Sequence, residues 1–164
     1  MKNIILKICL SFTLFLLYNC KAQTTSDYIT FYNGVVPKLN TIAANKTQYY
    51  GQNFSTFYNE LLNKNIQVAS LSCDYKTDPG SKYYVLRLFF EDNDLWSVAS
   101  DHDYQYPWVS ITFENEIPKQ IENMVKQTYG VWNNDFVIYF SNMKIEKIKF
   151  VGVNGYNSND WSGK

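Results

Sequence analysis

Acidic side chains and the chain's one histidine gather within a short central stretch of the sequence. The stretch opens with Glu91-Asp92-Asn93-Asp94 and closes with Asp101-His102-Asp103. Carboxylates bind hard cations, and a histidine beside carboxylates can bind a transition metal or act as a general base. The spacing fits no EF-hand loop, and a solvated connection between two strands is the alternative interpretation. A hydrolase or metal-dependent enzyme using the Glu91–Asp103 region is therefore one hypothesis, with no metal ligand and no cofactor assigned.

A second group of residues could bind a ligand without catalysing a reaction. The aromatic side chains between Trp96 and Trp108 could stack on a sugar ring or a peptide side chain, or could belong to the core. Arg87, the only arginine, stands alone in an apolar run. It could bind an anion with its fork of donors, or pair with a nearby carboxylate on a partly exposed sheet face. The candidate ligand-binding residues are Arg87, Trp96, Asp101, His102, Asp103, Tyr104 and Trp108.

Motifs and composition narrow the choice of function. The sequence has no Gly-x-Ser-x-Gly elbow, and Cys73 lies in an alternating strand pattern that predicts a buried, inert thiol. Fifteen basic and fifteen acidic side chains cancel, so no basic face for nucleic acid is indicated. Whether the protein is an enzyme stays open, with the balance against it. A domain that binds a protein, peptide or glycan is the leading hypothesis, and an inhibitor or immunity-type protein is a third.

The N-terminal residues have the pattern of an export signal. A lysine at position 2 precedes an apolar segment whose uninterrupted part is too short to cross a bilayer. Leu17-Tyr18-Asn19-Cys20 resembles the lipobox of bacterial lipoproteins, which implies cleavage before Cys20 and anchoring by acyl chains on that cysteine. The alternative is cleavage after Ala22, which would release a secreted protein. We therefore expect an exported protein, either periplasmic or anchored in the outer membrane.

The length of 164 residues predicts a single domain. Hydrophobic periodicity then divides this domain into elements. Helical spacing from Tyr28 to Ile42, interrupted at Gly34 and Pro37, predicts a broken helix capped by Ser26. Spacing of the same kind predicts a helix over 54–62 and another that has Pro118 as its first residue and stops at Gly130. The segment 135–142 fits a helix or a strand.

Two-residue alternation and short apolar runs mark the strands. The predicted strands cover 69–75, 83–91, 108–114 and 147–151, and the first two form a hairpin around a turn at 77–81. Grouped helices and hairpin-linked strands are typical of an α+β fold with a mainly antiparallel sheet of about four strands and helices on one face. The expected organisation is a signal at 1–19, a tether at 20–25, one domain at 26–154 and a polar tail at 155–164.

Overall fold

The computed structural model describes residues 23–76 and 82–164. The expected signal peptide, the lipobox cysteine Cys20 and both cleavage positions lie outside these described residues. The turn expected at 77–81 lies outside them as well.

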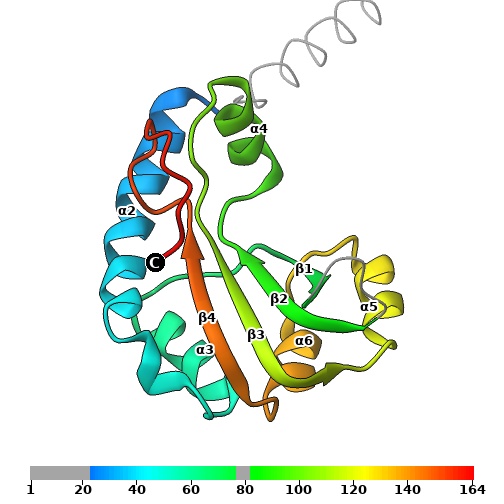
Figure 1. The fold of residues 1–164 in the computed structure, drawn as a ribbon. Helices are drawn as coiled ribbons and strands as arrows, with labels where there is room; N and C mark the ends of the chain where they lie inside the picture. The colour runs from blue at the N-terminus through cyan, green and yellow to red at the C-terminus, as the bar shows by residue number, and fades with distance from the viewer. Residues whose placement is uncertain (1–22, 77–81) are drawn as a thin grey trace, which may run out of the picture.

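The centre of the molecule is one four-stranded sheet (Figure 1). Its strands lie side by side in chain order, and each pairs with the next in antiparallel fashion. The strands are β1 (Ser70–Tyr75), β2 (Tyr83–Phe89), β3 (Trp108–Ile117) and β4 (Ile145–Val151). The predicted α+β class with a mainly antiparallel sheet of four strands is confirmed.

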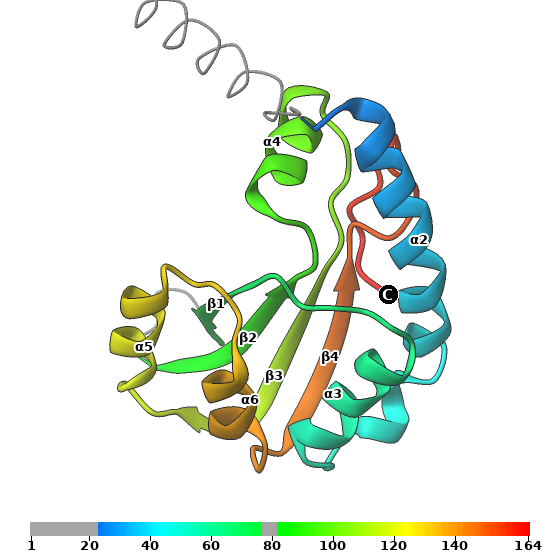
Figure 2. The same cartoon turned by 180° about the vertical axis from the view of Figure 1, so that it is seen from behind.

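Helices cover one face of this sheet and leave the other open. Figure 2 shows α3, α5 and α6 in front of the strands, with α2 running along the side of β4. The helices are α2 (Thr25–Ala43), α3 (Phe54–Asn63), α4 (Asn93–Asp101), α5 (Ile121–Thr128) and α6 (Asn134–Phe140), with a 3₁₀ turn η1 (Lys46–Tyr49) after α2. The ambiguous segment 135–142 is thus helical.

Buried and partly covered side chains alternate along the strands, so the sheet has one buried face and one open face. On β2, Leu86 and Leu88 are fully buried, whereas Arg87 between them is only partly covered. On β3, the buried positions Val109 and Ile111 alternate with partly covered positions in the same way. Because successive side chains of a strand point to opposite faces, the residues between the core positions form the open face of the sheet.

The helix α2 differs from the one predicted. α2 is continuous through Pro37, so the expected break is wrong. Proline removes one helical hydrogen bond, but α2 has buried residues on both sides of Pro37, at Val36 and Leu39, and this packing offsets the loss. The cap is Thr24 rather than Ser26: Thr24 Oγ1 accepts the amide N–H of Asp27, whose carboxylate in turn accepts the N–H of Thr24 at 2.8 Å.

The acidic connection between β2 and β3 contains a helix that the sequence patterns did not predict. α4 begins after Asp92, whose Oδ1 accepts the N–H of Leu95 at 2.8 Å. Ala99 is its only buried residue, so little of the helix lies in the core. The capping aspartate was the available signal. The helix predicted from Pro118 likewise begins later, at Ile121.

The polar C-terminal segment, residues 155–164, lies against the domain. Phe150 of β4 and Lys164 exchange two backbone hydrogen bonds of 3.0 and 2.9 Å. The chain turns toward this position at Gly152, which has a φ of +70°. A Cβ atom at Gly152 would lie 1.9 Å from the carbonyl oxygen of Tyr106. Only glycine fits this close approach of two backbones.

Replacement of Gly152 by alanine should therefore destabilise the domain strongly. We expect Gly152→Ala to lower the free energy of unfolding by about 3 kcal/mol, because the new Cβ must displace the Tyr106 backbone. Gly34→Ala is the matched control: it lies in α2 with nothing within 4 Å of its Cβ position, and should raise stability by about 0.5–1 kcal/mol. Urea unfolding measures both, and equal effects would contradict the assigned backbone contact.

Candidate functional site

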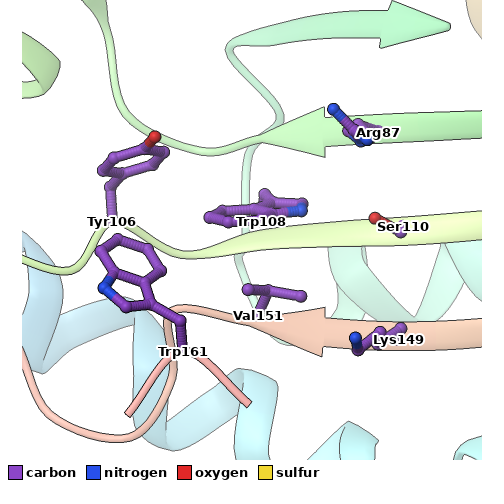
Figure 3. A pocket seen from close by; sticks show the side chains of 7 residues that line it. All are labelled: Arg87, Tyr106, Trp108, Ser110, Lys149, Val151 and Trp161. Carbon is purple, nitrogen blue, oxygen red and sulfur yellow. The ribbon is translucent and has the colours of Figure 1, made fainter. Parts of the chain in front are cut away.

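A cleft of about 570 Å³ lies on the open face of the sheet (Figure 3). We call it the open-face cleft. Arg87 of β2, Ser110 of β3 and Lys149 of β4 are successive cross-strand partners along its polar side. Its full lining is Arg87, Tyr106, Trp108, Ser110, Lys149, Val151 and Trp161.

Aromatic side chains form the other side of the open-face cleft. The ring centroids of Tyr106 and Trp108 lie 5.4 Å apart, and those of Trp108 and Trp161 lie 5.7 Å apart. Trp96 extends the group, with its ring 6.4 Å from that of Tyr106. Trp96 and Trp161 remain 47% and 40% exposed. Three separate parts of the chain, namely α4, the start of β3 and the C-terminal segment, thus build one aromatic surface.

A buried amide positions the C-terminal segment that carries Trp161. The side chain of Gln105 is fully buried, and its Nε2 donates to the carbonyl oxygens of Ser158 at 2.8 Å and Asp160 at 2.6 Å. Its Oε1 accepts the backbone N–H of Asn154 at 3.3 Å. Because buried amide groups are costly to leave unpaired, these three bonds fix the path of the segment beside the cleft.

The polar side of the cleft is cationic. Arg87 forms an ion pair with Asp74 of β1, as one interpretation of the sequence predicted. Lys149 forms no ion pair with any side chain of residues 23–76 or 82–164. The pKa of Lys46, in η1, is lowered by burial and then by the positive charges of Lys147 and Lys149. The β4 edge of the open face thus carries positive charge in excess.

A smaller hollow of about 300 Å³ adjoins the open-face cleft. Its lining is Ser70, Phe89, Glu91, Asn93 and Trp96. Phe89 is the cross-strand partner of Trp108, and their ring centroids lie 6.4 Å apart. The two hollows are therefore neighbours on the same face, separated by this aromatic pair.

Glu91 is the buried ionisable group of the smaller hollow. It is 4% exposed, and its Oε2 accepts the backbone N–H of Phe90 at 3.3 Å. Its Oε1 is buried and has no hydrogen-bond partner among the described residues. Burial raises the pKa of Glu91 to about 7, with a smaller contribution from the negative charge of Asp92. Its carboxyl group is therefore largely protonated in mildly acidic solution.

The structure brings some of the candidate ligand-binding residues together and leaves others apart. Arg87 and Trp108 line the open-face cleft, and Trp96 lies at its margin in the smaller hollow. Tyr104 lies elsewhere: its ring stacks on Tyr28 at 5.8 Å and meets the edge of Tyr156 at 5.2 Å. It therefore packs α2 against the C-terminal segment.

The remaining three candidates lie at the exposed end of α4. Asp101, His102 and Asp103 are all exposed. His102 Nε2 lies 3.1 Å from Thr25 Oγ1, and its ring stacks on that of Tyr104. Across residues 23–76 and 82–164, no three His, Cys, Asp or Glu side chains are placed to hold a metal ion. The acidic stretch thus caps and flanks a helix.

Sequence patterns did not single out several residues of the site. For Ser110 and Lys149 the sequence indicated only a polar position in an alternating strand. For Gln105 it indicated no role. Trp161 was recognisable only as a tryptophan of undecided burial in a polar segment. Its place beside Trp108 depends on contacts between residues more than fifty positions apart in the sequence.

Cys73 agrees with the expectation of an inert thiol. It lies on the helix-covered side of β1, partly buried, and burial raises its pKa to about 12. The reactive thiolate is therefore scarce at neutral pH.

Compared with known protein families, curated proteins and solved structures, the chain gives no match. Among the helices of the described residues, none combines the length and the apolar character needed to cross a membrane.

Burial of Glu91 should make stability depend on pH. The folded state holds the proton up to about pH 7, whereas the unfolded chain loses it near the ordinary value of 4.5. Stability present below pH 4.5 is therefore lost as the pH rises to about 7, by up to about 3 kcal/mol. We expect Glu91→Gln to gain stability relative to the wild type across this window in urea unfolding. Glu114→Gln removes an exposed carboxyl as the control, and parallel pH profiles for wild type and Glu91→Gln would refute the assignment.

Proposed function

We propose that this protein is a non-catalytic binding domain that holds a protein, peptide or glycan against the open face of its sheet. The open-face cleft and the aromatic surface beside it form the binding site. The pattern of residues 1–20 supports export to the periplasm or the outer membrane, with a lipid on Cys20 as the membrane anchor. In this proposal the domain acts outside the cytoplasm, held near a membrane.

The exposed aromatic surface is the observation that carries this proposal. Trp96 and Trp161 are about half exposed, next to the partly covered Tyr106 and Trp108. Removal of large aromatic side chains from water lowers the free energy. A contiguous exposed group of them therefore marks an interaction surface. Clustered aromatics of this kind supply most of the affinity in many binding interfaces.

Binding fits the chemistry of the cleft better than hydrolysis does. The lining of the open-face cleft holds no carboxylate, histidine or thiol among the described residues. Ser110 and Lys149 are cross-strand partners, but the described structure shows no hydrogen bond between their side chains. A nucleophile needs such a bond to its base. Of the acidic residues around α4, Asp92 caps the helix, and Glu91 is buried in the smaller hollow, outside the lining of the open-face cleft.

The test compares aromatic substitutions inside and outside the site. The labelled wild-type protein is applied to an array of bacterial polysaccharides, peptidoglycan fragments and peptides to find the bound compounds. We expect Trp108→Ala and Trp161→Ala each to weaken binding to those compounds about 30-fold, as truncation of an interface tryptophan does. Tyr129→Ala is the control, because Tyr129 is an aromatic residue 94% exposed at the end of α5, outside the cleft lining.

Two results would count against the open face as the binding surface. One is undiminished binding in both tryptophan variants. The other is an equal loss in Tyr129→Ala, which would place the aromatic contact elsewhere.

A further inference from the structure

We propose that the ligand of the open-face cleft is an acidic glycan, whose sugar rings stack on Trp108 and Trp161 while its anionic groups pair with Lys149 and Arg87. This inference rests on the proposed binding function and adds the chemistry of the ligand. Three features of the described structure support it: the placement of the cations, the covered sheet edges and the charge of the open face.

The two cations of the cleft lie on different strands, on either side of a serine. Arg87 and Lys149 lie on either side of Ser110 in one cross-strand row, so their strands are two strand spacings apart, roughly 10 Å. A chain that carries several anionic groups can pair with both, and the Ser110 hydroxyl between them can donate or accept a hydrogen bond.

Both cations keep capacity for a ligand. The Arg87 guanidinium pairs with Asp74 through one of its nitrogens and carries five N–H donors, so donors remain for a second partner. Its side chain is 42% exposed. Lys149 has no ion pair within the described residues, and Lys147 adds charge beside it on β4. The cleft therefore favours a negatively charged ligand over a neutral one.

The sheet edges argue against an extended peptide added as a fifth strand. At the β1 edge, Leu71 donates to the carbonyl of Gly130 at 2.9 Å, and Trp132 donates to that of Ala69 at 3.0 Å. At the β4 edge, Phe150 is paired with Lys164. Strand addition needs unpaired backbone groups at an edge. With both edges partly occupied, the ligand must be recognised through side chains of the open face.

The open face offers what a sugar ring needs from side chains. The rings of Trp108 and Trp161 are tilted by 34° to each other and line the cleft together. The negatively polarised face of an aromatic ring attracts C–H groups, which a pyranose presents on its flat side. Serine and lysine donors in the same cleft match the hydroxyl and carboxylate groups at the rim of such a ring.

The experiment compares three probes on the purified full-length chain by isothermal titration calorimetry. The probes are a hexameric oligouronate, the same hexamer with its carboxyl groups reduced to alcohols, and poly-glutamate of similar charge. We expect the oligouronate to bind at least about tenfold more tightly than the other two, and its affinity to fall as salt is raised. Lys149→Met should weaken its binding about fivefold or more, while Lys119→Met, at an exposed lysine outside the cleft lining, should not.

The outcomes separate this inference from the binding function on which it rests. Equal affinity for the charged and the reduced hexamer, unaffected by Lys149→Met, would overturn the acidic ligand and leave a glycan-binding domain. Binding of poly-glutamate without the oligouronate would overturn the glycan in favour of an acidic peptide. Failure of the oligouronate to bind overturns the inference, whereas the array result with Trp108→Ala decides the binding function. Near-ultraviolet circular dichroism checks that each variant is folded.

Discussion

Burial of one face of the four-stranded sheet places alternate side chains of every strand on the opposite face, away from the helices. Leu86 and Leu88 point into the core, so Arg87 must point out of it. The same constraint acts on β3 and β4, where it brings Ser110 and Lys149 into register with Arg87. The polar side of the cleft is therefore a direct consequence of how the core is packed, and no dedicated loop is needed to build it.

The aromatic side of the cleft has a different physical origin, because it depends on segments that are distant in the sequence. Gln105 holds the C-terminal segment through its buried amide, and Gly152 lets the chain that leaves β4 pass close to the backbone of Tyr106. The hydroxyl of Tyr32, in α2, donates to the carbonyl of Gly152 at 2.9 Å and accepts the N–H of Gly155. These contacts tie three parts of the chain together, so the position of Trp161 is set by tertiary structure rather than by local preference.

This difference explains how far the fold and the site could be predicted from the sequence. Strand alternation and helical spacing are local signals, and they correctly indicated the four strands and α3. The break expected at Pro37 was wrong, because packing of α2 outweighs the loss of one hydrogen bond. α4 was not predicted because little of it lies in the core. The contact between Trp161 and Trp108 could not be predicted because it joins residues distant in the sequence. Arg87 was recognised because a lone charge in an apolar strand is itself a local signal.

Several of the hydrogen bonds that hold the C-terminal segment are made to its main chain. Gln105 and Asn154 bind the carbonyl oxygens of Ser158, Asp160 and Ser162, and Lys164 pairs with β4 through its backbone. Every residue type supplies such carbonyl groups, so these hydrogen bonds place few demands on the side chains of the segment. This wall of the cleft can therefore accept new side chains while the scaffold stays unchanged. Mutation in an evolving lineage, or in a designed library, can alter what the cleft selects without first having to redesign the fold.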